Sequence, residues 1–133
     1  YNFDYQVGTW LKTDKYKIKK QLVVYDRYYY DYYVDLKRYQ YDLPKWLPRV
    51  CAPFIPKPNL VFVLDGSAEC LHSRKQELSV NEIERQLLEY RKIAEDYSFA
   101  QLVNVERNID EIVDDITTEI LKYCNQQTLK IMK

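Results

Sequence analysis

The chain has 133 residues, of which 47% are hydrophobic and 30% charged, and its formal net charge is zero. This size fits one domain with one hydrophobic core. No stretch approaches the roughly 18 apolar residues that a membrane span needs, so we expect no membrane partner and a cytoplasmic location. The neutral charge and the lack of a recognition motif argue against a nucleic-acid partner.

The first half of the chain contains the stretch QLVVYDRYYYDYYVD, which begins at Gln21. Residues 22–25 form an apolar run of β-formers, too short for a helix and typical of a strand buried on both faces. This predicted strand ends at Asp26. The preceding residues 9–20 predict a helix with an imperfect apolar stripe. The tyrosine-rich residues 28–41 predict a helical first part that gives way to a loop.

Five prolines punctuate the next part of the chain and allow at most a short helix around residues 46–51. Residues 60–64, LVFVL, are the clearest strand in the sequence, and Asp65 follows them directly. A helix is expected to begin near Ser67, which is a favourable N-cap residue.

The second half of the chain predicts two helices and one further strand. Ser79 and Glu82 form a capping-box pattern, and the apolar residues after them recur at steps of three and four, which indicates an amphipathic helix. Residues 102–105 predict a third strand. Asn108 is expected to cap the last helix, and residues 125–133 carry weak signals that are typical of a frayed tail.

Strands that alternate with helices favour a parallel sheet, because parallel strands need long crossovers and helices supply them. We therefore expect a single α/β domain over residues 1–133, with three strands and flanking helices. The first strand has a buried character and should have a neighbour on each side. This predicts that at least one more strand belongs to the sheet and is supplied by sequence outside this chain.

Polar residues follow two of the predicted strands. Ligands of open α/β sheets bind at the carboxyl ends of the strands, where Asp26, Arg27 and Asp65 are expected to lie. A carboxylate there can hold a metal ion, and a guanidinium offers a planar fork that matches phosphate. The alternative is structural: Asp26 caps the following helix and Arg27 pairs with a neighbouring carboxylate.

A basic pair, Arg74 and Lys75, is expected in the connection between two helices. Such cations can close over a transferring phosphoryl group and stabilise its charge. Alternatively, they satisfy the dipole at a helix C-terminus. The tyrosines likewise have two interpretations, since they can stack on a planar base or pack at a core or an interface.

Cysteine and glycine contents exclude several kinds of site. The three cysteines are widely spaced and form no metal-ligand pattern, which is typical of reduced thiols. His72 is the only histidine, and we expect it on a helix surface. The two glycines, Gly8 and Gly66, cannot build a GxxxxGK[ST] phosphate loop or a GxGxxG fingerprint.

The order of these parts resembles the thymidylate kinase-like family of the P-loop nucleoside monophosphate kinase superfamily. The resemblance rests on VVYDRYYYDYYVD, on PNLVFVLDGSAECLHSRKQEL with its basic pair, and on the helix containing EYRKIAEDY. It covers roughly residues 21–124. The closest likeness is to divergent bacterial members with a DRYYYD signature.

The resemblance implies ATP- and magnesium-dependent phosphoryl transfer to a nucleoside monophosphate or a similar acceptor, which makes the chain a kinase and a nucleotide-binding transferase. Asp26 would lie near the metal and the acceptor phosphate, and Arg27 would bind that phosphate. Arg74 and Lys75 would belong to the lid over the donor phosphates. The remaining implied contacts are Tyr28 and Tyr29 near the acceptor pocket, and residues 105–108, including Asn108, near the adenine.

One part of the family pattern is not found in these 133 residues: the first strand, the Walker A loop and the helix after it. We therefore interpret the chain as a fragment, the C-terminal part of a thymidylate kinase-like phosphotransferase domain. Because that loop positions the phosphates, we expect the chain alone to show no kinase activity. The alternative is a degenerate kinase-like domain that acts as a protein-interaction or regulatory module, and that forms homo-oligomers through an exposed sheet edge or its tyrosine-rich face.

Overall fold

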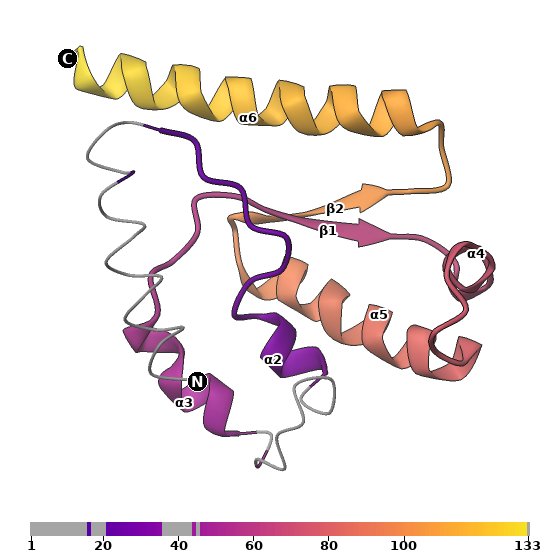
Figure 1. The fold of residues 1–133 in the computed structure, drawn as a ribbon. Helices are drawn as coiled ribbons and strands as arrows, with labels where there is room; N and C mark the ends of the chain where they lie inside the picture. The colour runs from indigo at the N-terminus through magenta and orange to yellow at the C-terminus, as the bar shows by residue number, and fades with distance from the viewer. Residues whose placement is uncertain (1–15, 17–20, 36–43, 45, 133) are drawn as a thin grey trace. The chain divides into compact units, whose positions relative to one another are not determined.

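The computed structural model describes residues 16, 21–35, 44 and 46–132 of the chain (Figure 1). The chain divides into two compact units, Tyr1–Lys57 and Pro58–Lys133. Each unit is described here by itself. The helix predicted over residues 9–20 lies outside the described residues, with the exception of Tyr16.

The second unit contains a two-stranded parallel sheet. Strands β1 (Val61–Asp65) and β2 (Ala100–Asn104) pair in a register that sets Val63 opposite Leu102 and Leu64 opposite Val103. Strand β1 is rich in Val and Phe, which favour the pleated backbone, whereas β2 contains one such residue, Val103. The predictions of strands over residues 60–64 and 102–105 are thus confirmed, although β2 begins two residues earlier than expected.

Three helices flank this sheet, and each begins at the cap that the sequence predicts. Helix α4 (Ala68–Arg74) starts after Ser67, whose side chain accepts a hydrogen bond from the Cys70 N–H. Helix α5 (Val80–Asp96) starts after Ser79, which accepts from Glu82 N–H, and α6 (Ile109–Ile131) starts after Asn108. Helix α6 continues to Ile131, across most of the segment in which the weak signals predicted a frayed tail.

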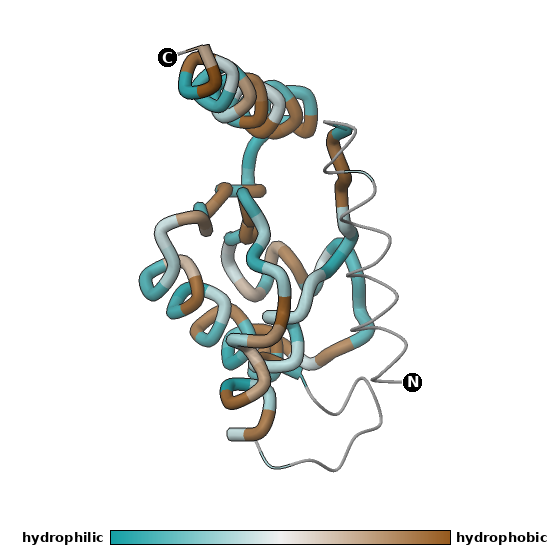
Figure 2. Tube along the Cα trace, turned by 90° about the vertical axis from the view of Figure 1, so that its left-hand side faces the viewer, coloured by the Kyte–Doolittle hydropathy of each residue, from teal (hydrophilic) through white to brown (hydrophobic). Residues whose placement is uncertain are grey.

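Helices α5 and α6 cover opposite faces of the sheet (Figure 1). On one side, Ile112 and Ile116 of α6 pack with Val103, Val105 and Phe62. A second buried cluster joins α4 to α5 and comprises Ala68, Ile83 and Leu87, with Leu71, Leu78 and Val80 packed against it. Hydrophobic and hydrophilic residues alternate along α6 in Figure 2, as expected for a helix with one face on a sheet. The sequence-predicted class, an α/β fold with a parallel sheet and flanking helices, is confirmed in this coarse form.

The number of strands was predicted wrongly. Residues 22–25 form no strand, and β1 and β2 make the only ladder among the described residues. Leu22 and Val24 are 66% and 77% exposed, which is the opposite of a strand buried on both faces. A run of β-formers prefers an extended backbone, but it becomes a strand only where a neighbouring backbone accepts its hydrogen bonds.

The described part of the first unit is built from short helices. Helix α2 (Asp31–Val34) lies within the tyrosine-rich stretch, and α3 (Leu47–Cys51) leads directly into the 3-10 helix η2 (Ala52–Phe54). These confirm the short helix expected around residues 46–51 and the helical start of the tyrosine-rich segment. In the part of the chain that the structure describes, no helix has the length and apolar character to cross a membrane.

Candidate functional site

The polar end of β1 is held by an ion pair from α5. The carboxylate Oδ1 of Asp65 accepts a hydrogen bond from Nε of Arg91 at 2.9 Å, and Nη2 of Arg91 lies 2.8 Å from the same oxygen. The side chains are partly exposed, so the pair fixes the turn after β1 more than it contributes to the core. Asp65 was expected at the carboxyl end of a strand, and it lies there, but the sequence did not identify Arg91 as its partner.

The turn after β1 approaches the end of β2 closely. A Cβ atom placed on Gly66 would lie 3.2 Å from Cγ2 of Val105 and 3.4 Å from Cγ of Glu106. Few Cβ contacts are that short, so a side chain here would force the Val105 and Glu106 side chains to shift by a few tenths of an ångström. Glycine at this position thus allows those two side chains to lie close to the turn after β1.

Glu106 joins the β2–α6 connection to the start of α4. Its Oε1 accepts a hydrogen bond from Ser67 N–H at 2.6 Å, and its own N–H donates to Oδ1 of Asn104 at 2.7 Å. Hydrogen bonds from Ser67, with a smaller contribution from the positive charge of Arg74, lower the pKa of the Glu106 carboxyl below its ordinary value. No sequence motif marks Glu106 as a contact residue, because it meets the start of α4 from a distant segment.

Arg74 lies at the same edge of the sheet. Its Nη2 donates to the carbonyl oxygen of Val105 at 2.8 Å, so the guanidinium contacts the residue that directly follows β2. Lys75 points elsewhere, since its Nζ pairs with Oε1 of Glu77 at 3.1 Å and both side chains are largely exposed. The two members of the predicted basic pair therefore have different surroundings.

His72 and Asn108 have structural contacts. The Nδ1 atom of His72 lies 2.9 Å from the carbonyl oxygen of Leu78, and the residue is half-buried rather than on the surface as expected. Oδ1 of Asn108 accepts from Asp110 N–H at 3.0 Å, which confirms its capping role. The adenine contact that the resemblance implies for Asn108 stays a prediction.

In the first unit, Arg27 and Asp31 form an ion pair. Nη1 of Arg27 lies 3.1 Å from Oδ2 of Asp31, which is four residues further along the chain. Asp26 is exposed. It does not cap α2, because the N-cap residue is Tyr30 and no side chain caps that helix. Of the two structural alternatives, the pairing of Arg27 with a neighbouring carboxylate is therefore observed, and the capping by Asp26 is not.

Two tyrosines of the predicted acceptor pocket bond to the proline-rich segment. The hydroxyl of Tyr28 donates to the carbonyl of Pro56, and that of Tyr29 donates to the carbonyl of Pro48 at 2.7 Å. Burial, and next the neighbouring Cys51, raise the pKa of Tyr29 to about 12. These contacts fasten the residues before α2 to α3 and to the residues after η2, so packing accounts for Tyr29, while Tyr28 stays half-buried.

The tyrosine rings also pack on one another. The Tyr29 ring centroid lies 5.5 Å from that of Tyr32 and 6.0 Å from that of Tyr33, and the Arg49 guanidinium carbon lies 5.7 Å from the Tyr33 centroid. Tilted and edge-on rings at these separations attract one another. This arrangement corresponds to the packing interpretation of the tyrosine cluster.

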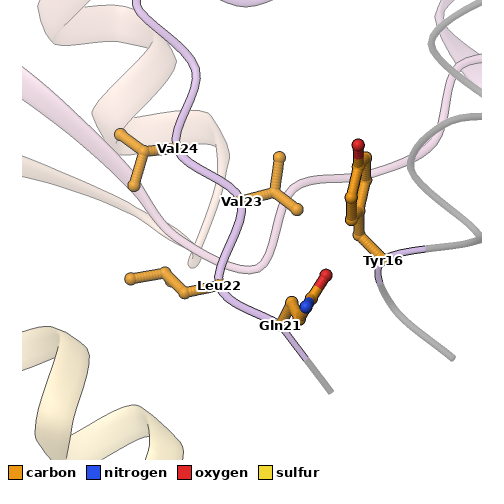
Figure 3. A pocket seen from close by; sticks show the side chains of 5 residues that line it. All are labelled: Tyr16, Gln21, Leu22, Val23 and Val24. Atoms are coloured by element: carbon orange, nitrogen blue, oxygen red, sulfur yellow. The ribbon is translucent and has the colours of Figure 1, made fainter. Parts of the chain in front are cut away.

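A shallow hollow of about 530 Å³ lies beside the predicted first strand and is lined by Tyr16, Gln21, Leu22, Val23 and Val24. Figure 3 shows Leu22 and Val24 on one side of the backbone and Val23 on the side of Tyr16. None of the predicted site residues lines this hollow. Its walls are mostly apolar, so it offers no charged group to a phosphate.

The residues of this chain fit the two implied cofactors, magnesium and ATP, only in part. Magnesium in phosphotransferases is usually held by one or two carboxylates together with phosphates and water, and an exposed Asp26 suits one such position. Within the described residues, no three His, Cys, Asp or Glu side chains gather in a way that could hold a metal by themselves. ATP would lack its phosphate loop, because the sequence has no glycine-rich segment to form one.

The site is thus described as two separate groups, one in each unit. Asp26, Arg27, Tyr28 and Tyr29 belong to the first, and Arg74, Lys75 and Asn108 belong to the second. Comparison with known proteins identifies no relative for either group: no family model, no curated protein and no solved structure matches the chain.

Proposed function

We propose that this chain supplies the acceptor and lid elements of a thymidylate kinase-like phosphotransferase with a P-loop NTPase-like fold. The activity of such a protein is ATP-dependent phosphoryl transfer to a nucleoside monophosphate or a similar acceptor. The order of motifs along the chain suggests this function. The position of Arg74 beside the carboxyl end of β2 is the structural observation that carries it.

Arg74 suits a lid role because of where its guanidinium lies. Ligands of parallel α/β sheets approach the carboxyl ends of the strands, and Arg74 reaches this edge from the last turn of α4. Its present acceptor is a neutral carbonyl. A phosphate carries a full negative charge and can accept two parallel hydrogen bonds from the guanidinium, so a nucleotide would compete for this side chain.

Arg27 suits the acceptor role because it is partly exposed and carries a permanent charge. The side chain is 43% exposed although it is held by Asp31. A guanidinium matches phosphate through two parallel N–H···O bonds, and it does not lose its proton in proteins. Tyr28, which is half-buried, adjoins it in sequence and would border the acceptor, whereas Tyr29 is buried and bonds to Pro48.

Of the two cofactors, magnesium and ATP, the proposal assigns a ligand in this chain only to magnesium. Asp26 would contribute one oxygen to a magnesium ion that arrives with the nucleotide. The chain has no Walker A loop, so we expect no thymidylate phosphorylation by the chain alone in the presence of ATP and magnesium. Activity in a purified sample that is lost in Arg27→Ala would overturn this expectation.

Binding is the direct test of the acceptor role. Isothermal titration of the 133-residue chain with thymidylate should show binding, and Arg27→Ala should weaken it by about tenfold or more, because a charged hydrogen-bond partner is removed. Arg85→Ala is the matched control, since Arg85 forms an exposed ion pair with Glu82 within α5. Equal affinities in all three proteins would refute the acceptor role.

The second candidate is an interaction module, and the apolar surface of the small sheet favours it. Leu64 and Leu102 are 54% and 48% exposed, although each is opposite a buried valine in the neighbouring strand. Exposed apolar groups on a sheet invite pairing with another chain. Size-exclusion chromatography with light scattering separates the two functions, because a strictly monomeric chain of 16.2 kDa would count against this candidate.

A further inference from the structure

Arg27 has an unusual backbone. Its φ is 75°, and it is the one residue with a positive φ in the part of the chain that the structure describes. A residue with a Cβ atom disfavours this left-handed conformation, and arginine has no side-chain group that compensates for it locally. Residues in such conformations persist where the surroundings hold them, and they gather at ligand sites.

Asp31 is the group that holds Arg27. It lies in the first turn of α2 and is 8% exposed, which makes it the one charged residue among the buried residues that the structure describes. A buried carboxylate needs a charged or hydrogen-bonding partner, and Nη1 of Arg27 lies 3.1 Å from its Oδ2. The interaction therefore restrains the side chain of Arg27.

The pair is asymmetric in its exposure. The Asp31 side chain is 11% exposed, whereas that of Arg27 is 43% exposed. An ordinary i,i+4 ion pair on a helix surface has both members in water and restrains neither strongly. Here the carboxylate is on the inside and the guanidinium faces outward, so the acid acts as a fixed support for a charge that solvent and solutes can reach.

We propose that Asp31 is a positioning residue that holds the Arg27 guanidinium ready for the phosphate of a monophosphate acceptor. This inference rests on the proposed function, and it adds a residue that the motif comparison did not assign. Asp31 itself does not touch the acceptor. It fixes the left-handed turn at Arg27 and the direction of the planar fork, so that less conformational freedom is lost when phosphate binds.

The test compares two ligands that differ only by the phosphate. Asp31→Asn keeps the shape of the side chain and removes its charge. We expect this variant to bind thymidylate about tenfold more weakly and thymidine with unchanged affinity, measured by isothermal titration on the full chain. Asp115→Asn, which alters an exposed pair with Arg107, is the matched control and should change neither affinity.

A double variant separates positioning from a general structural role. If Asp31 acts through Arg27, then Arg27→Ala combined with Asp31→Asn should lose no more thymidylate affinity than Arg27→Ala alone. Additive losses, or an equal loss of affinity for thymidine, would overturn the proposal. Should Asp31→Asn fail to fold by circular dichroism, Asp31→Glu takes its place with the same expectations, because it keeps the charge and displaces the carboxylate by one methylene.

Failure of the proposed function is recognisable separately. If the unaltered chain binds neither ligand, thymidylate is not its acceptor, and the positioning claim is decided by nuclear magnetic resonance. The Nη–H signals of Arg27, identified by their loss in Arg27→Lys, should be slow to exchange with solvent because Nη1 donates to Asp31, and they should change in Asp31→Asn. A signal that is the same in both proteins would overturn the claim that Asp31 holds Arg27.

Discussion

Two stretches of this chain have nearly the same local pattern and different structures. LVVYDR at residues 22–27 and VFVLDG at residues 61–66 each place four apolar β-formers before an aspartate. The second stretch is strand β1, and its Val63 is 6% exposed, whereas the first forms no strand and its Val24 is 77% exposed. The difference lies in their neighbours, because β1 has β2 and residues 22–25 have no strand ladder.

The aspartates that follow the two apolar runs also differ in whether a distant side chain contacts them. Asp65 is held by Arg91 from a helix 26 positions away in the sequence. Asp26 is exposed, and the residue after it adopts a left-handed backbone and pairs with Asp31. The comparison shows that an apolar run before an acid identifies a position where a strand can form, and that a strand forms there only with a partner.

The largest expected effect comes from placing a charge in each stretch. Val63→Asp buries an uncompensated carboxylate and should destabilise the chain by more than about 3 kcal/mol. Val24→Asp exposes its carboxylate to water and should change the free energy of unfolding by less than about 0.5 kcal/mol. Urea denaturation measures both. Similar losses in the two variants would mean that residues 22–25 are buried in solution.

The next largest loss of stability is expected when Arg91, the partner of Asp65, is removed. Arg91→Ala removes the hydrogen bond and the ion pair to Oδ1 and leaves a partly buried carboxylate without its partner, which should cost about 1–2 kcal/mol after allowance for solvent exposure. Arg85→Ala, in an exposed pair, should cost no more than about 0.5 kcal/mol. If urea denaturation gave equal losses in the free energy of unfolding for the two variants, the contact of Asp65 with Arg91 of α5 would contribute no more to stability than an exposed ion pair.

A smaller effect is expected in the first unit at alkaline pH. The pKa of Tyr29 is raised to about 12, so the unfolded chain loses this proton near pH 10 while the folded chain keeps it. The contribution of Tyr29 to stability is therefore complete below pH 10 and decreases as the pH rises from 10 towards 12. The difference in tyrosinate absorbance between the unaltered chain and Tyr29→Phe should show one phenol that titrates late. A phenol that titrates with the exposed tyrosines would contradict the burial of Tyr29.

The smallest effect on stability is expected at acid pH and comes from Glu106. This side chain is fully exposed, so its hydrogen bond contributes little. Its folded pKa is depressed below the ordinary value of 4.5, so its contribution to stability is present above pH 4.5 and is lost as the pH falls through the folded pKa. Glu106→Gln should lose this part of the acid dependence in thermal denaturation at a series of pH values. Identical pH profiles would show that the Ser67 hydrogen bond has no influence on stability.

Local signals predicted the helices of the second unit well. Ser79 and Asn108 each carry a side-chain oxygen that accepts from the first turn, and both caps are observed at the expected residues. The apolar stripe of α5 turns Ile83 and Leu87 inward, as predicted. These features depend on residues that are close in sequence, which is why the sequence alone was sufficient for them.

The candidate site was predicted less completely. The positions of Arg74 and Asp65 at the carboxyl ends of the strands follow from the strand–helix order. The partners Arg91 and Glu106 do not, because each comes from a distant segment and no short motif marks it. The pairing of Arg27 with Asp31 was foreseen as an alternative, while its left-handed backbone was not.

The caps, the amphipathic helices and the two runs of β-formers follow from residues that are close in sequence, because steric preference, side-chain hydrogen bonds to nearby backbone and the spacing of apolar residues set them. Which run became a strand, and which distant side chains meet at its end, depends on contacts between distant segments. The physical reason is that a strand and an ion pair each need a partner, and the partner can come from any part of the chain.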